Sequence, residues 1–229
     1  MNLTDRLKQQ AAWRAAEYVQ SGMILGLGTG STTRFALERI AELLKQGHLK
    51  NISGIPSSLQ TEALARSLGI PLASFDAHSE IDLTIDGADE VDPDLNLIKG
   101  GGGALLREKV LAQAGRRNII IVDESKLSPQ LGSKWPLPVE VVPFALGVEM
   151  KFLQSLGAKV SLRKNSDGSP YRTDQGNEIL DADFGPIAAP AELARQLDQR
   201  AGIVEQGLFL GLATEVIVAG ESGIRQLKR

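Results

Sequence analysis

The chain has 229 residues, of which 42% are hydrophobic and 23% charged, a balance that excludes a disordered or fibrous protein. Lys and Arg number 25 against 28 Asp and Glu, and the net charge of -3 argues against nucleic-acid binding. The absence of cysteine excludes disulfides, thiolate zinc sites and a cysteine nucleophile, and no apolar run approaches the length of a membrane span. We therefore expect a cytoplasmic protein with neither a nucleic-acid nor a membrane partner.

Strands and helices alternate along the first half of the chain. Apolar residues at helical spacing predict the helices, and short apolar runs predict buried strands. In order, the sequence predicts a helix over 4–20, a strand over 23–27, a helix over 31–46, a strand over 51–55, a helix over 57–69, strands over 70–75 and 81–86, a helix over about 103–114 and a strand over 118–122. This alternation indicates parallel βαβ units, and hence a doubly wound α/β sheet.

The pattern changes after residue 122. Four prolines within fifteen residues, at positions 129, 136, 138 and 143, mark a boundary. The elements predicted beyond them are a strand over 139–142, a helix over 145–156, a strand over 158–163, turns over 164–177, a strand over 178–183, a helix over 190–200 and buried strands over 202–209 and 215–220. We expect a mostly parallel, Rossmann-like domain over 1–131 and 207–229, with a smaller α+β domain over 132–206 inserted into it.

The first candidate motif is GLGTGSTTR, residues 26–34, where a strand turns into a helix. Glycine lets the backbone approach a ligand, and the free N–H groups of a helix N-terminus favour an anion such as phosphate. Ser31 replaces the last glycine of a dinucleotide fingerprint that would begin at Gly26, and no P-loop lysine follows. A phosphomonoester site and a plain turn with Ser31 as helix cap remain equally open from these residues.

The second motif, DGADEVDPD over 86–94, has five carboxylates at the carboxyl end of a predicted strand, where α/β sheets bind ligands. A solvated acidic loop is the alternative. A calcium loop beginning at Asp92 is excluded, because Leu97 replaces its glycine and Gly103 its closing glutamate. A magnesium site on Asp86 and Asp89 stays open.

The third motif is Lys99 followed by four glycines and then the helix ALLREKV. Four consecutive glycines lose much entropy on folding, so close approach of the backbone to a ligand is the better interpretation. The lysine and the helix N-terminus suit a developing oxyanion. Glu108 in that helix could point back at the same place, or be a surface charge between Arg107 and Lys109.

The fourth motif is DESK, residues 123–126, in which Lys126 follows a strand as the aspartates do. The two histidines, His48 and His78, lie in no motif, and neither a G-x-S-x-G elbow nor an H-E-x-x-H zinc motif is present. A general base, if one is needed, must therefore be a carboxylate.

In their order and spacing, GTGSTT, DGADEVD, LIKGGGGALLREKV and DESK closely resemble ribose-5-phosphate isomerase of the A type. The likeness continues through residues 138–145, 171–181 and 202–209, and so covers almost the whole chain. One departure is Gln206, where we expect histidine or asparagine in many relatives. It lies outside the four motifs.

The resemblance implies an aldose–ketose isomerase that interconverts ribose 5-phosphate and ribulose 5-phosphate through an enediolate, in the non-oxidative pentose phosphate pathway, without metal or cofactor. It implies that Glu108 moves the proton between C2 and C1, that Asp86 and Asp89 hold sugar hydroxyls, the first also acting in ring opening, and that Lys99 stabilises the oxyanion. The expected catalytic residues are Glu108, Asp86 and Lys99, and the expected substrate-binding residues are Thr29, Gly30, Ser31, Thr32, Asp86, Gly87, Ala88, Asp89, Lys99, Gly100, Gly101, Gly102 and Lys126. Lys8 is a further candidate for the phosphate, and a homodimer or homotetramer is expected.

Two other functions remain open. One is a metal-dependent sugar-phosphate isomerase that uses a hydride shift, with the acidic run as its ligands. The other is a sensor domain that binds a sugar phosphate without catalysis. A sensor needs the anion loop but no base, so the presence of Glu108 argues against it.

Overall fold

The computed structural model describes residues 2–229, which group by their contacts into two compact units. Unit 1 contains the residues up to Ala88 together with Arg107–Lys126 and Gly211–Arg229. Unit 2 contains Asp89–Leu106 and Leu127–Leu210. The chain therefore enters unit 2 from unit 1 twice, and both times it returns.

Unit 1 is built on a six-stranded sheet in the order β13-β12-β6-β3-β1-β2. Its strands are β1 (Ile24–Leu27), β2 (Ser53–Pro56), β3 (Leu83–Asp86), β6 (Asn118–Asp123), β12 (Glu215–Gly220) and β13 (Gly223–Lys228). All neighbours are parallel except β12 and β13, which pair antiparallel at the edge. Strand β12 brings the chain back to this sheet after its second passage through unit 2.

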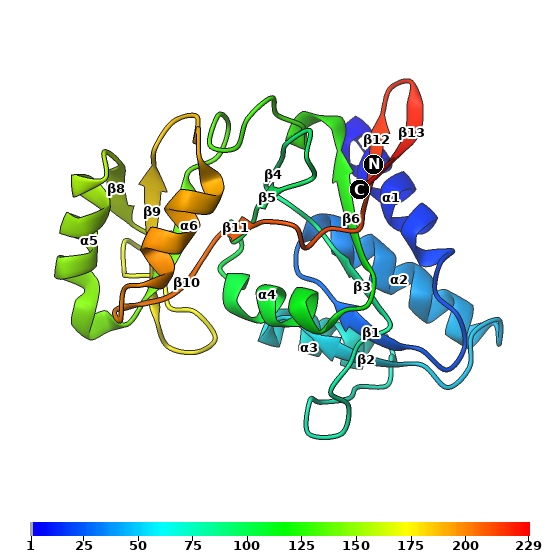
Figure 1. Ribbon diagram of the computed structural model, residues 1–229. Helices are drawn as coiled ribbons and strands as arrows, with labels where there is room; N and C mark the ends of the chain where they lie inside the picture. Colours follow the sequence, from blue (N-terminus) through cyan, green and yellow to red (C-terminus); the bar gives the residue numbers. More distant parts are fainter. Residues whose placement is uncertain (1) are drawn as a thin grey trace. The chain divides into compact units, whose positions relative to one another are not determined.

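Helices lie on both faces of this sheet (Figure 1). They are α1 (Leu3–Ala16), α2 (Ser31–Lys45), α3 (Leu59–Ser67) and α4 (Leu105–Ala114), the last of which begins in unit 2. Alternate residues of a strand point to opposite faces. Accordingly Leu25 joins the core cluster formed with α1 and α2, whereas Ile24 joins the cluster of Leu111 on α4. The expected doubly wound sheet is confirmed.

Unit 2 contains a four-stranded antiparallel sheet in the order β10-β7-β9-β8 and a three-stranded sheet in the order β11-β5-β4. The strands are β4 (Glu90–Val91), β5 (Leu97–Ile98), β7 (Leu137–Val141), β8 (Lys159–Leu162), β9 (Glu178–Asp183), β10 (Ile203–Gln206) and β11 (Leu208–Phe209). Two helices, α5 (Leu146–Ser155) and α6 (Pro190–Asp198), pack Leu153 and Leu197 into the same core as Val139 and Leu180. The expected smaller α+β part is thus present as an insertion.

Two predicted elements of unit 1 differ in the structure. The first helix ends at Ala16 instead of residue 20, although Val19 is buried, because the chain turns there and still packs this side chain on the core. Residues 70–75 form only an isolated bridge between Leu72 and Gly54. Pro71 lacks the N–H that a regular strand would need here.

Three further differences concern short or polar strands. The stretch 202–209, predicted as one buried strand, divides into β10 and β11, because each half finds a different partner, β7 and β5 respectively. Strand β13 was not predicted, since its residues are mostly exposed and polar, as an edge strand allows. The acidic run forms the hairpin of β4 and β5, in which the buried Glu90 accepts hydrogen bonds from the N–H groups of residues 132–134.

The expected domain limits stay a prediction. Grouping by contacts assigns 89–106, 127–131 and 207–210 to unit 2, because β4, β5 and β11 pair with one another there. Across the described residues, no helix combines the length and the apolar character needed to cross a membrane.

Candidate active site

Four segments of unit 1 lie at the carboxyl ends of four neighbouring parallel strands, β6, β3, β1 and β2. They contain Lys126, Asp86, Thr29 and the pair Ser57–Ser58, respectively. Because parallel strands end at one edge of the sheet, this edge gathers a cation, a carboxylate and several hydroxyls, as expected of a ligand site in an open α/β sheet.

Asp86, the last residue of β3, is buried and fixes the glycine turn that follows β1. Its Oδ1 accepts hydrogen bonds from the N–H of Thr29 at 3.1 Å and of Gly87 at 2.7 Å. A Cβ at position 28 would lie 2.2 Å from that oxygen, so Gly28 is required by the close approach of Asp86. Two of the predicted motifs are thereby joined.

The side chain of Thr29 belongs to a group of hydroxyls that sequence analysis missed in part. Its Oγ1 lies 2.7 Å from Ser57 Oγ, 2.8 Å from Ser58 Oγ and 2.9 Å from Thr61 Oγ1. Thr61 in turn donates to the carbonyl of Gly28 at 3.0 Å. The position of Ser57 and Ser58 directly after a predicted strand was the available signal.

The N-terminus of α2 carries no side-chain cap. Its N-cap is Gly30, with φ +118°, so the interpretation of Ser31 as a cap is wrong. Ser31 Oγ instead accepts a hydrogen bond from Lys8 Nζ at 3.0 Å, which places this further candidate at the motif. A cavity of about 350 Å³ adjoins the turn and is lined by Gly28, Gly30, Ser31, Arg34, Leu37, Gln60, Thr61 and Leu64.

Lys126 ends the short 3₁₀ helix η1 (Glu124–Lys126) and is half-buried. The turn leading to it is closed by Asp123, whose Oδ1 accepts hydrogen bonds from the N–H of Ser125 at 3.0 Å and from its hydroxyl. The lysine therefore stands on an ordered turn at the end of β6.

Glu108 lies in the first turn of α4 and is only 6% exposed. Its neighbour Lys109 is equally buried. The alternative in which Glu108 is a solvated surface charge is therefore wrong. Burying a carboxylate costs free energy, so solubility does not explain why a glutamate stands at this position of the helix.

In unit 2 the other half of the acidic motif contacts the glycine run. Asp89 Oδ2 accepts a hydrogen bond from the N–H of Gly101 at 2.7 Å, and a Cβ at position 101 would lie 2.6 Å from Asp89 Oδ1. Gly100 has φ +106° and faces Leu105 and Pro138, so only glycine suits this position. The acidic motif is thus built into two hydrogen-bonded loops rather than being a free solvated loop.

Lys99, at the start of the glycine run, is also buried, at 4% exposed. Its N–H donates to the carbonyl of Gly207 at 2.9 Å, and its Nζ lies 5.5 Å from the centre of the Phe209 ring. An ammonium group over the face of an aromatic ring is attracted by the negative charge density of that face. A lysine placed in this way suits the stabilisation of an anion.

Two residues of unit 2 that sequence analysis missed hold the glycine run: Arg163 and Tyr171.

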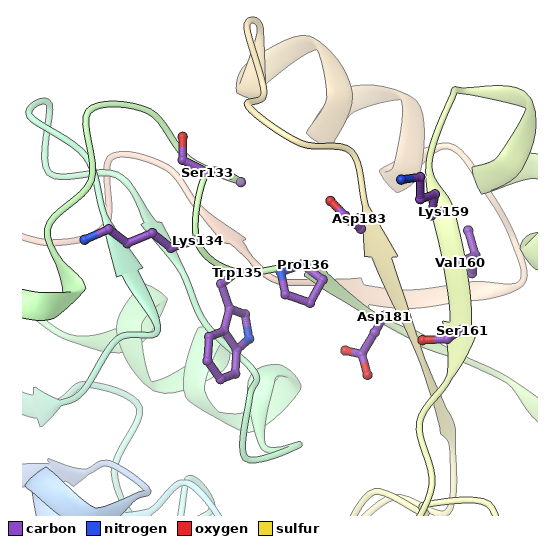
Figure 2. A pocket seen from close by; sticks show the side chains of 10 residues that line it. Ser133, Lys134, Trp135, Pro136, Lys159, Val160, Ser161, Asp181 and Asp183 are labelled. Carbon is purple, nitrogen blue, oxygen red and sulfur yellow. The ribbon is translucent and has the colours of Figure 1, made fainter.

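Unit 2 also contains a cavity of about 420 Å³, bordered by Trp135, Pro136, Lys159 and Asp181 among others (Figure 2). None of the predicted site residues lines it. Within residues 2–229, no three His, Asp or Glu side chains are grouped as a metal site would require.

Comparison with known proteins agrees with these motifs. The family described as ribose 5-phosphate isomerase A (phosphoriboisomerase A) matches residues 53–223. The ribose-5-phosphate isomerase A of Desulfatibacillum aliphaticivorans is 63% identical over 228 residues, covering 100% of this chain and 99% of that protein. That of Chloroflexus aurantiacus is 56% identical, with coverage of 98% and 94%.

Solved structures agree in fold. A D-ribose-5-phosphate isomerase in complex with phospho-erythronic acid superposes with a TM-score of 0.97 at 41% identity, with complete coverage of both chains. The ribose 5-phosphate isomerase of Plasmodium falciparum gives 0.95 at 42% identity, with coverage of 98% and 99%. With its motifs, its fold and these relatives in agreement, the chain belongs to the ribose 5-phosphate isomerase A family.

Proposed function

We propose that this protein is an isomerase that interconverts D-ribose 5-phosphate and D-ribulose 5-phosphate, with Glu108 as the base. The observation that carries this assignment is the burial of Glu108 in the helix that directly follows Lys99 and the glycine run. The reaction needs a base near a carbon proton and a fixed positive environment for an oxyanion, and these motifs supply both.

The reaction begins with the open-chain aldehyde. The Glu108 carboxylate removes the proton from C2, and the C2–H electron pair forms the C1–C2 double bond of an enediolate. Lys99 and the N–H groups of the glycine run stabilise the negative oxygen. As the enediolate forms, the π electrons of the C1 carbonyl move onto O1, which then takes the hydroxyl proton of O2. Glu108 returns its proton to C1, and the carbonyl forms at C2. No electrons leave the substrate, so the isomerisation itself consumes no oxidant or reductant.

The remaining residues bind the sugar phosphate. Asp86 and Asp89 accept hydrogen bonds from sugar hydroxyls, and Asp86 also assists ring opening. The phosphate is held by the segment Thr29–Thr32 and by Lys126, with Lys8 as a further cation. Gly87 and Ala88 complete the loop between the aspartates. The uncapped N-terminus of α2, with Lys8 at Ser31, supports the phosphate assignment.

The decisive assay follows ribose 5-phosphate to ribulose 5-phosphate in deuterium oxide. Incorporation of solvent deuterium at C1 of the product supports proton transfer through an enediolate, although internal return of the same proton lowers its extent. Turnover with complete retention of the substrate hydrogen would favour a hydride shift. Binding without turnover would favour the sensor function.

The same assay decides the need for a metal ion. We expect turnover to survive exhaustive dialysis against a chelator, because Lys99 and the glycine run supply the positive charge. A loss of activity that magnesium or manganese restores would reassign Asp86 and Asp89 to metal binding. Calcium offers a control cation with the same charge.

We also propose that the protein self-associates, as a homodimer or a homotetramer, and acts in the cytoplasm. The fully exposed Phe144 and the half-exposed Val148 on adjoining turns support self-association, since large apolar side chains in one patch favour contact with another surface. Light scattering on the purified protein gives the mass directly. A monomeric mass at micromolar concentration would contradict this proposal.

A further inference from the structure

Arg163, the residue that directly follows β8, contacts the backbone of the glycine run. Its Nη1 donates to the carbonyl of Gly100 at 2.7 Å and to the carbonyl of Gly101 at 3.1 Å. A guanidinium group donates in a fixed plane, so two adjacent carbonyls held by one nitrogen leave the peptide groups little freedom to rotate.

Arg163 is itself held by a carboxylate. Its Nε donates to Asp181 Oδ2 at 2.9 Å, its Nη2 donates to Asp181 Oδ1, and the two side chains are only 14% and 20% exposed. Asp181 lies opposite Ser161 in the pairing of β9 with β8, beside the cavity seen in Figure 2. A two-point contact of this kind fixes the orientation as well as the charge of the guanidinium.

Tyr171 adds a second contact from the same part of unit 2. Its N–H donates to the carbonyl of Arg163 at 2.9 Å, and its hydroxyl donates to the carbonyl of Gly102 at 3.2 Å. A Cβ at position 103 would lie 2.3 Å from that hydroxyl, so the ring occupies the space that Gly103 leaves. Three consecutive carbonyls of the run are thus held by two side chains.

The carbonyl contacts determine where the N–H groups point. In a planar trans peptide the C=O and N–H bonds are directed to opposite sides. The peptide between Gly100 and Gly101 shows this: its carbonyl faces Arg163, and its N–H donates to Asp89 Oδ2 at 2.7 Å. The carbonyl of Gly101 also faces Arg163, so the N–H of Gly102 is directed away from Arg163.

We propose that Arg163, oriented by Asp181, is a positioning residue that aims and polarises the N–H of Gly102 toward the oxyanion of the enediolate, since the N–H groups of Gly101 and Gly103 already donate to Asp89 and to the carbonyl of Gly100. It does not touch the reacting atoms. A charged donor on a carbonyl strengthens the N–H of the same amide, and preorganised donors lower the barrier most where negative charge develops. This inference rests on the proposed isomerase function.

The test compares Arg163→Met with Arg172→Met in the complete protein. Arg172 makes a matched control. It belongs to the same unit and forms an ion pair with the buried Glu178 at 2.9 Å, and this ion pair does not involve the glycine run. We expect kcat of Arg163→Met to fall by about 10²-fold, with KM within about threefold of wild type. Arg172→Met should keep kcat within about threefold.

Two readouts separate positioning from general loss of structure. The affinity for phospho-erythronic acid, whose carboxylate carries charge at the reacting end, should fall at least about tenfold, while that for inorganic phosphate stays within about twofold. Amide hydrogen exchange in the peptide containing residues 99–104 should accelerate in Arg163→Met alone. Equal exchange in both variants would overturn the proposal.

The double variant Arg163→Met/Asp181→Leu covers the case in which Arg163→Met does not fold. It removes the stranded carboxylate along with the arginine, so the fold should recover while kcat stays low. A folded double variant with wild-type kcat would overturn the positioning role. Failure of the wild-type protein to convert ribose 5-phosphate would instead refute the proposed function, and the exchange result would still report on the contacts between Arg163 and the glycine run.

Discussion

The two glycine segments of this protein are ordered by different means. In unit 1, the turn at Gly28–Gly30 is held by the buried Asp86 and by neutral hydroxyls around Thr29. In unit 2, the run at Gly100–Gly103 is held at its carbonyls by the Arg163–Asp181 ion pair and by Tyr171. We assign the first to phosphate binding and the second to the oxyanion. A site that only binds an anion can rely on close packing, whereas one that stabilises a transient charge gains from charged support.

The strongest way to break this comparison is Gly28→Ala in unit 1. The new Cβ would lie 2.2 Å from Asp86 Oδ1 and 2.7 Å from its Cα, so the backbone of β3 must shift. We expect a loss of about 1–3 kcal/mol in unfolding free energy and a fall of about 10²-fold or more in kcat/KM. Urea unfolding and steady-state kinetics measure both.

Gly101→Ala is the corresponding change in unit 2, and its effect should be smaller. Its Cβ would meet only the carboxylate end of Asp89, a side chain that can turn aside. Gly147→Ala is the control, since nothing lies within 4 Å of its Cβ in α5, and alanine there should stabilise by about 0.5–1 kcal/mol. An equal loss of activity in the two site variants would refute the claim that the first turn is the more closely packed.

Lys126→Ala tests the division of labour between the two segments. A charge-assisted contact contributes about 1.5–3 kcal/mol, so KM for ribose 5-phosphate should rise about tenfold or more. Free ribose, which lacks the phosphate, serves as the control substrate and should show little of this penalty. An equal loss on both substrates would remove Lys126 from phosphate binding.

The smallest expected effect concerns Glu140, which is buried and accepts hydrogen bonds from Thr173 at 2.8 Å and Asn177 at 2.9 Å. These residues belong to the segment that carries Tyr171. Burial raises the pKa of Glu140 above its usual value. Stability from this group is therefore complete at pH values below the unfolded pKa and is lost as the pH rises through the folded pKa.

Glu140→Gln removes that titration and keeps an oxygen that can accept both hydrogen bonds. Relative to wild type, the variant should gain unfolding free energy as the pH rises above the usual pKa of a glutamate. Parallel curves of unfolding free energy against pH for the two proteins would contradict a raised pKa of Glu140.

Sequence alone predicted the alternating fold and the unit 1 turn because their signals are contiguous. The strand, the glycines and the following helix of the turn stand within residues 23–46. The hydroxyls of Ser57 and Ser58 reach it from the next strand, which a linear pattern does not reveal. The sequence therefore predicted the turn after β1 but not the serine hydroxyls that help to order it.

The support of the glycine run could not be predicted, since it comes from residues about sixty positions later. Arg163 follows a short, partly exposed strand, and Tyr171 lies in a stretch that composition identifies only as turns. The division of residues 202–209 between two sheets has a similar origin. Both depend on which strands pair, and pairing is decided by tertiary contacts.

The most direct measurement of the central claim is kcat of Glu108→Gln. Glutamine preserves the size and much of the hydrogen bonding of this buried side chain but cannot accept a carbon proton. General acid–base catalysis contributes about 10²- to 10⁴-fold, so kcat should fall by at least that factor while KM changes little. Deuterium at C2 of the substrate should be lost to water with wild type and retained with the variant. Wild-type kcat in folded Glu108→Gln would contradict the mechanism.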